Sequence, residues 1–165
     1  RRHIDPDCIV KVIEDYKNLN QLSEDAALLS TGDPMLSGLG YLKGPVIPGI
    51  SSLQVACARL KISELKVIPI TVHGRNLEPE IIAFELRRGR SVFLLTDEQT
   101  DLESLCKYLE SQGLHRKVAA LSDLGYDEER IDLRDTSSPP RAPGQARLRW
   151  RRVHLSFLKS NPVRR

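Results

Sequence analysis

Apolar residues near the start of the chain follow first a helical and then a strand-like pattern. In residues 5–22 they recur at three- and four-residue steps after Asp5-Pro6, a typical helix start: Ile9, Val12, Ile13, Tyr16 and Leu19. Residues 26–30 are instead a short apolar run that ends at the turn-forming residues 31–34. We therefore predict an amphipathic helix over 5–22 and a buried strand over 26–30 with a sharp loop at its carboxyl end.

The rest of the chain alternates between these two patterns. A second short strand and tight turn are predicted within residues 44–50, and Ser51 or Ser52 can cap the helix that follows. Pro69 favours an edge or a bulged position for its strand. The predicted elements are a helix over 53–60, a strand over 67–72, a helix over 79–88, a strand over 91–96, a helix over 102–112 closed by Gly113, and a strand over 117–121. This alternation predicts an α/β fold.

Changes in composition divide the chain into three parts. We place a boundary near residues 63–64, which gives an N-terminal α/β lobe over 1–63 and a second α/β lobe over 64–137. Residues 138–165 form a basic tail rich in proline and arginine, within which only 153–158 has the pattern of a strand. We expect this tail to be loosely held or to contribute a lone edge strand.

Charge is distributed unevenly between these parts. Residues 1–137 hold 17 Lys/Arg against 22 Asp/Glu, a net charge of −5, whereas 138–165 hold 8 basic residues and no acidic one. A nucleic-acid interaction would therefore rest on the tail alone, where we favour a solvated segment. We find no apolar run long enough for a membrane span and no signal-peptide pattern in residues 1–7, so we expect a cytoplasmic protein. The wide spacing of Cys8, Cys57 and Cys106 predicts buried, reduced thiols.

Two glycine-containing loops are the strongest candidates for a ligand site. The first is Ser30-Thr31-Gly32-Asp33-Pro34-Met35-Leu36-Ser37-Gly38-Leu39-Gly40, and the second is Val46-Ile47-Pro48-Gly49-Ile50-Ser51-Ser52. Glycine lets a ligand approach the backbone and proline stiffens a turn, although either loop alone is also ordinary turn chemistry. Each loop follows a predicted strand, and ligands of open α/β sheets bind beyond the carboxyl ends of strands.

The two loops, in this order and spacing, resemble those of the tetrapyrrole methylase family. The segment Thr71-Val72-His73-Gly74-Arg75 narrows the resemblance to the branch that methylates precorrin-6Y or cobalt-precorrin-7 at carbon 5, and residues 124–131 are similar to a further family segment. The family pattern begins with a strand and a glycine-proline-rich loop that this sequence does not show. We therefore expect the first strand to be missing and the chain to be part of a longer protein.

The resemblance implies two α/β lobes, usually in a homodimer, with S-adenosylmethionine in the cleft between the lobes. Carried over to this sequence, the cofactor-binding residues would be Gly32, Asp33, Met35, Ser51, Ser52, Leu95 and Ala120. No catalytic residue is assigned, because methyl transfer from a sulfonium depends mainly on alignment and exclusion of water. Arg75 and His73 would contact the corrin precursor, whose carboxylates suit arginine. A separate precorrin decarboxylase or methyltransferase is a candidate partner.

Several alternatives remain open. The acceptor could instead be uroporphyrinogen or diphthamide, or the chain could be a non-enzymatic module that binds nucleic acid or an acidic partner through residues 138–165. His73 is also typical of a structural histidine, and the four histidines lack metal-ligand spacing, so no metal site is expected. The acidic residues at 97–103 fit the start of a helix. Those at 127–129 are interpreted as a solvated turn.

Overall fold

The computed structural model describes residues 7–13, 16–23, 25–72, 75–97, 99–140 and 154–159. By its internal contacts the chain forms two compact units, Arg1–Ile50 and Ser51–Arg165. This division lies earlier in the sequence than the boundary expected near residues 63–64. That boundary concerns the lobes of the family fold and stays a prediction.

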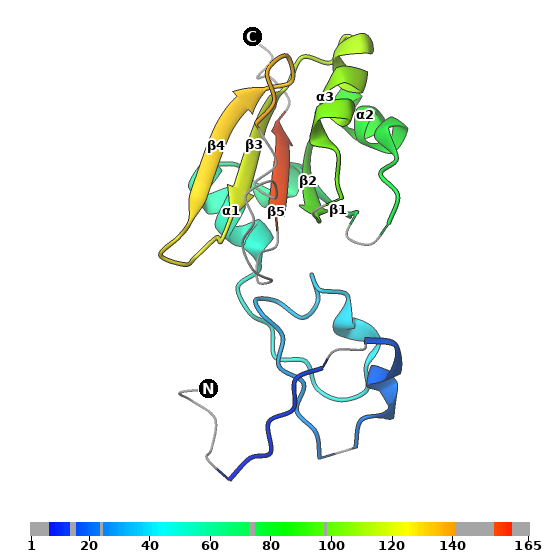
Figure 1. The fold of residues 1–165 in the computed structure, drawn as a ribbon, viewed down its shortest axis with the longest axis vertical. Coiled ribbons are helices and arrows are strands. Elements are labelled where there is room, and N and C mark those ends of the chain that lie inside the picture. Colours follow the sequence, from blue (N-terminus) through cyan, green and yellow to red (C-terminus); the bar gives the residue numbers. More distant parts are fainter. Residues whose placement is uncertain are drawn as a thin grey trace. The chain divides into compact units, whose positions relative to one another are not determined.

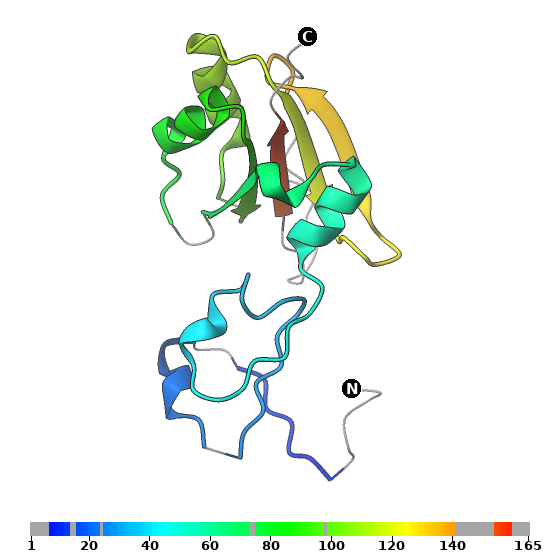
Figure 2. The ribbon, with the colours of Figure 1, turned by 180° about the vertical axis from the view of Figure 1, so that it is seen from behind.

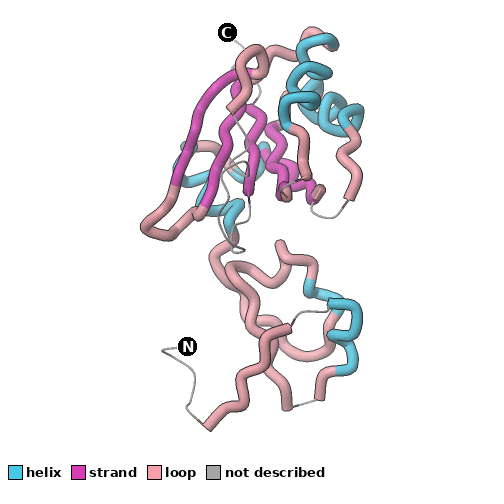
Figure 3. The backbone as a smooth tube through the Cα atoms, in the orientation of Figure 1, coloured by secondary structure: helices cyan, strands magenta, loops and turns pink. Residues whose placement is uncertain are grey.

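The described residues of the first unit form loops and two short 3-10 helices (Figure 3). These are η1 over Tyr16–Gln21 and η2 over Leu39–Tyr41. The helix predicted over 5–22 is wrong for residues 7–13, which are not helical. Ile9 and Val12 in this stretch are 88% and 78% exposed. An isolated helix of this length is marginal in water, because most helical stability in proteins comes from packing of the apolar face.

The two strands predicted within this unit are also wrong. Residues 26–30 and 44–50 form no strand, and Leu29 and Ile47 are 73% and 86% exposed. A strand requires a neighbour for its backbone groups, and neither segment is paired with another strand in the described part of the chain.

The second unit is built on a five-stranded sheet in its described residues (Figure 1). The strands are β1 (Val67–Thr71), β2 (Ser91–Thr96), β3 (Lys117–Ser122), β4 (Arg130–Asp135) and β5 (His154–Lys159), in the spatial order β1-β2-β5-β3-β4. β1 is parallel to β2, and β5 is antiparallel to both β2 and β3. β1, β2 and β3 therefore run in one direction, and their carboxyl ends lie at the same edge of the sheet.

Two features of the sheet differ from expectation. β5 confirms the strand predicted in the tail, but it lies between β2 and β3 rather than at an edge. β4 was not predicted, although Ile131 and Leu133 alternate with charged residues as in a half-exposed strand. The edge position predicted from Pro69 is confirmed, because β1 forms one edge of the sheet.

The predicted helices of this unit are confirmed to within two residues: α1 over Ser52–Leu60, α2 over Pro79–Arg87 and α3 over Leu102–Ser111. A short 3-10 helix, η3, spans Glu64–Lys66. α2 and α3 bury Ile82, Leu86, Leu105 and Leu109 against Val92, Leu94 and Val118 of the sheet, which forms the core. α1 lies behind β3 and β4 in Figure 1 and in front of them from the opposite side (Figure 2).

The cysteines divide into two kinds. Cys57 and Cys106 are buried free thiols, as predicted, and burial raises the pKa of Cys106 to about 12. Cys8 is exposed, so its predicted burial is wrong. A thiol with so high a pKa is protonated at neutral pH, which makes Cys106 an unreactive core residue.

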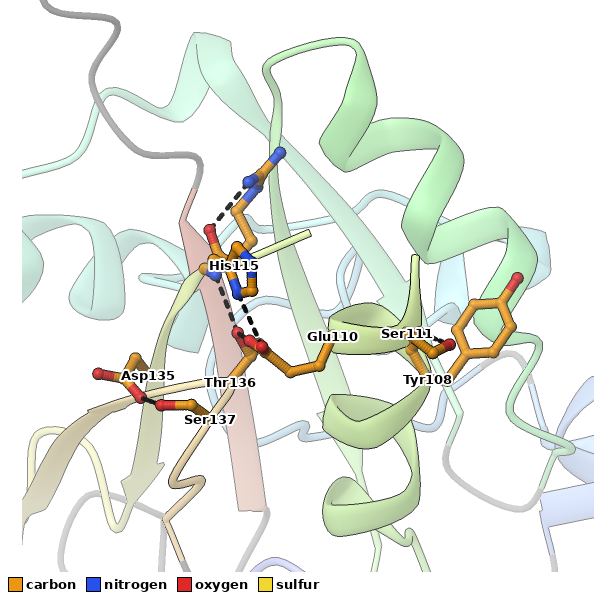
Figure 4. A network of polar contacts seen from close by, with 8 residues as sticks. Tyr108, Glu110, Ser111, His115, Asp135, Thr136 and Ser137 are labelled. Atoms are coloured by element: carbon orange, nitrogen blue, oxygen red, sulfur yellow. Dashed lines mark hydrogen bonds and ion pairs between the residues drawn. The ribbon is translucent and has the colours of Figure 1, made fainter. Parts of the chain in front are cut away.

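A polar network joins the end of α3 to the end of β4 (Figure 4). Glu110 accepts a hydrogen bond from the Thr136 hydroxyl and pairs with Nδ1 of His115 at 2.7 Å. The Thr136 hydroxyl in turn accepts from the Arg116 N–H at 2.9 Å. These contacts fix the amino end of β3. That end lies opposite the edge of the sheet at which β1, β2 and β3 have their carboxyl ends.

Candidate functional site

The first glycine loop is braced by its own hydrogen bonds. Ser37 donates through both its N–H and its hydroxyl to the Asp33 carbonyl, each at 3.2 Å, and the Leu39 N–H donates to the Pro34 carbonyl at 3.0 Å. The Asp33 carboxylate accepts the Met35 N–H at 3.3 Å. Gly32 has φ of 77°, in the left-handed region that favours glycine. The loop is therefore an ordered turn in which Gly32 and Met35 are exposed and Asp33 is half-buried.

The second glycine loop lies directly against the first within the same unit. A Cβ atom added to Gly49 would stand 2.4 Å from the Gly32 carbonyl oxygen and 3.0 Å from its carbonyl carbon. Only a residue without a side chain permits this approach. The structure thus brings the backbones of Gly32 and Gly49 together, although they are far apart in the sequence. Both glycines are exposed to solvent.

The two serines that follow the second loop belong to the start of α1. Ser51 is the N-cap: its hydroxyl accepts the Gln54 N–H at 3.1 Å, while its own N–H donates to Gln54 Oε1 at 2.8 Å. This capping box confirms Ser51 as the cap and buries it. Ser52 is the first helical residue and is half-buried. Ser51 therefore has a structural role in addition to the binding role predicted for it.

Two of the other predicted residues of the second unit, Leu95 and Arg75, lie at the carboxyl edge of the sheet. Leu95 lies near the end of β2, and its carbonyl accepts the Val72 N–H at 2.9 Å. The Arg75 N–H donates to the Val72 carbonyl at 3.0 Å, which places Arg75 on the same edge, exposed. Ala120 is further back, buried within β3. His73 lies outside the described residues.

An ion pair that the sequence did not reveal joins α1 to the turn after β3. Arg59 Nε donates to Glu129 Oε1 at 2.6 Å, and Arg59 Nη2 donates to Oε2 at 3.2 Å. The hydrogen bonds from Arg59 and then from the Gly125 N–H hold the pKa of Glu129 below its ordinary value. The interpretation of residues 127–129 as a solvated turn is therefore wrong for Glu129. No short-range pattern links two residues this far apart in the chain.

The described part of the chain holds neither a cluster of metal ligands nor a helix that could span a membrane. No three His, Cys, Asp or Glu residues gather there in a way that could hold a metal ion. No helix described by the structure combines the length and the apolar character that a bilayer span requires.

A comparison with protein families matches most of the chain. The model described as Tetrapyrrole (Corrin/Porphyrin) Methylases covers residues 6–136. The chain therefore belongs to the tetrapyrrole (corrin/porphyrin) methylase family, and its α/β architecture is that of the family.

Individual relatives extend this assignment. The chain is 34% identical over 129 residues to a probable cobalt-precorrin-7 C(5)-methyltransferase of Methanocaldococcus jannaschii, a match that covers 72% of this chain and 60% of that protein. The crystal structure of a precorrin-6Y methylase of cobalamin biosynthesis from Archaeoglobus fulgidus has a TM-score of 0.51 at 27% identity, over 80% of this chain and 60% of that one.

A third relative shows the fold with a ligand. Uroporphyrin-III C-methyltransferase from Thermus thermophilus, complexed with S-adenyl homocysteine, has a TM-score of 0.53 at 18% identity and covers 78% of this chain and 62% of that one. This chain thus spans about three-fifths of the length of each of the three relatives.

Proposed function

We propose that the protein transfers a methyl group from S-adenosylmethionine to carbon 5 of a corrin precursor, either precorrin-6Y or cobalt-precorrin-7. The observation that carries the proposal is the approach of Gly49 to the Gly32 carbonyl, which puts the two motif loops side by side. The choice of a corrin acceptor is supported by the two relatives named for cobalt-precorrin-7 and precorrin-6Y. The same two relatives favour a corrin acceptor over uroporphyrinogen and diphthamide.

The chemistry assigns simple tasks to the residues of the loops. S-adenosylmethionine, when bound, supplies a methyl group on a cationic sulfonium, so the protein needs to hold and orient the donor and exclude water. Gly32 and Gly49 leave the backbone of both loops accessible, since neither carries a side chain. Asp33 follows Gly32 directly in the first loop, and its carboxylate offers a negative charge to a cationic ligand. We assign the donor to Gly32, Asp33, Met35, Ser51, Ser52, Leu95 and Ala120.

The acceptor side is assigned to Arg75 and His73. The Arg75 side chain is exposed at the carboxyl edge of the sheet, and a guanidinium binds carboxylates through paired hydrogen bonds. From the family resemblance we further propose a homodimer and a precorrin decarboxylase or methyltransferase as partner. A cytoplasmic location is proposed from the sequence pattern alone.

The test is a methyl-transfer assay of the full-length protein with a methyl-labelled donor. Precorrin-6Y, cobalt-precorrin-7, uroporphyrinogen and diphthamide-pathway acceptor protein are offered in parallel. Label should appear in one of the two corrin acceptors only. Labelling of uroporphyrinogen or of the protein acceptor instead would move the enzyme to another branch of the family, and labelling of none would refute the activity.

A further inference from the structure

Helix α1 is attached to its unit by few buried side chains. Of its residues only Ala56 and Cys57 are buried. A pocket of about 290 Å³ that is partly open to solvent lies between its last turn and the sheet, lined by Leu60 of α1, by Ala119 of β3 and by Leu133 of β4, among others. The side chains that line this pocket lack packing partners on the side that faces it. Apolar packing therefore fixes α1 only partly, and directional contacts become important for its position.

The Arg59–Glu129 pair supplies such a contact. The guanidinium and the carboxylate meet through two parallel hydrogen bonds of 2.6 and 3.2 Å, a geometry that fixes orientation as well as distance. Oε2 of Glu129 also accepts the Gly125 N–H at 2.8 Å. Glu129 thus connects α1 to the backbone of the turn that directly follows β3. The Glu129 side chain is 18% exposed and that of Arg59 is 49% exposed, so solvent screens the pair in part.

We propose that Arg59 and Glu129 are positioning residues for the donor site, because their ion pair holds α1, and with it Ser51 and Ser52, against the turn after β3. The inference rests on the proposed function, since it assigns Ser51 and Ser52 to the donor. Neither Arg59 nor Glu129 touches the donor in this account.

A helix transmits displacement along its length. Arg59 and Ser51 are separated by eight residues, or roughly 12 Å of helix. The capping box makes Ser51 part of the rigid helix, because both its N–H and its hydroxyl are bonded to Gln54. Loss of the pair at one end should therefore move or loosen the serines at the other.

The test uses Glu129→Gln in the full-length protein with two readouts. Glutamine keeps an acceptor for the Gly125 N–H but loses the charge that binds Arg59. Amide hydrogen exchange should become faster in α1 and stay unchanged in α3. The Kd for S-adenosylhomocysteine, measured by calorimetry, should rise about threefold, the effect of losing one partly exposed pair.

The matched control is Glu103→Gln. Glu103 pairs with Lys107 at 2.7 Å on α3, on the surface and outside the proposed site. The Glu103→Gln variant should change neither the rate of amide hydrogen exchange in α1 nor the Kd for S-adenosylhomocysteine. If Glu129→Gln fails to fold, Arg59→Lys, which keeps the charge but not the paired geometry, replaces it with the same expectations.

Each adverse outcome overturns a distinct claim. Unchanged exchange in α1 would refute the link between Arg59–Glu129 and the helix, whatever the protein binds. Faster exchange with an unchanged Kd would refute the positioning role while the proposed function stands. Failure of the wild-type protein to bind S-adenosylhomocysteine would refute the donor site and the positioning role together, and the exchange data would still decide whether the pair holds α1.

Discussion

Gly49 and Gly32 approach each other so closely that a Cβ atom on the former would overlap the carbonyl oxygen of the latter, at 2.4 Å. The contact joins the two loops that carry the family motif. Within the described residues 25–50, no strand pairing and no backbone hydrogen bond joins the two loops at this point. The absence of a side chain at residue 49 is therefore a requirement of the loop arrangement, and it gives the most specific mutation for the donor site.

We predict that Gly49→Ala forces the two loops apart and weakens donor binding. The φ of Gly49 is not positive, so alanine causes no backbone strain and acts only through its Cβ. The Kd for S-adenosylhomocysteine should rise about tenfold, which corresponds to roughly 1.4 kcal/mol. Calorimetry measures it directly.

Gly44→Ala serves as the control for that variant. Gly44 has φ of 107°, so alanine strains the backbone there, but its Cβ would enter open space. The control should lose stability and keep its donor affinity. Equal loss of affinity in both variants would show that general loop strain, and not the contact between the loops, explains the effect.

A second prediction concerns the acceptor. Arg75→Ala should raise the KM for the corrin acceptor about tenfold, the loss expected for one charge-assisted hydrogen bond, and leave the Kd of the donor unchanged. Arg87, which lies on α2 and donates to Gln112 at 2.9 Å, provides the matched Arg87→Ala control. If Arg75→Ala weakens donor binding and leaves the KM for the acceptor unchanged, Arg75 belongs to the donor side of the site.

A third prediction is a pH dependence of stability. The Ser104 N–H and hydroxyl donate to the Asp101 carboxylate at 2.9 and 2.7 Å, and these bonds hold its pKa below the ordinary value. Because the folded-state pKa is the lower one, the stabilisation is complete above the unfolded pKa, about 3.9, and is lost as pH falls through the folded value.

Asp101→Asn isolates this contribution, because asparagine is also a good N-cap and does not titrate in this range. The difference in free energy of unfolding between wild type and variant, from urea melts, should shrink as pH drops below about 4. A difference that stays constant down to the acid limit would contradict the assignment.

A fourth prediction concerns the end of α1. Lys61 has φ of 54°, a conformation that costs a side chain about 1 kcal/mol and that glycine adopts readily. Lys61→Gly should raise the free energy of unfolding by about 0.5 kcal/mol, because part of the relief is offset by greater entropy of the unfolded chain. Lys66 does not have a positive φ, so Lys66→Gly should lower the free energy of unfolding. Destabilisation by both would mean that Lys61 makes contacts that outweigh its strain.

The sequence predicted the second unit much better than the first. The helices α1, α2 and α3 and the strands β1, β2 and β3 each combine a local apolar period with a recognisable start or end, such as the Ser51 cap or Gly113 with φ of 69°. The helix predicted over 5–22, which is wrong for residues 7–13, and the strands predicted over 26–30 and 44–50 have the same local patterns. Such a pattern shows what a segment can form when another element covers its apolar side. Ile9, Leu29 and Ile47 are exposed, so these three segments are not covered in this way.

Non-local relationships were beyond sequence reasoning. A strand was predicted over residues 153–158, but nothing in that segment indicates insertion between β2 and β3. The alternation of Ile131 and Leu133 could have revealed β4. The Arg59–Glu129 pair could not have been found, because two charges seventy residues apart carry no mutual signal. The motif loops are recognisable in the sequence as a family pattern, whereas the contact of Gly49 with Gly32 is visible only in the structure.

The most direct test of the account is a crystal structure of the full-length protein with S-adenosylhomocysteine bound. We predict that the ligand contacts the backbone around Gly32 and the start of α1 at Ser51 and Ser52. Binding at a site formed by neither loop, or no binding at saturating ligand, would contradict the account.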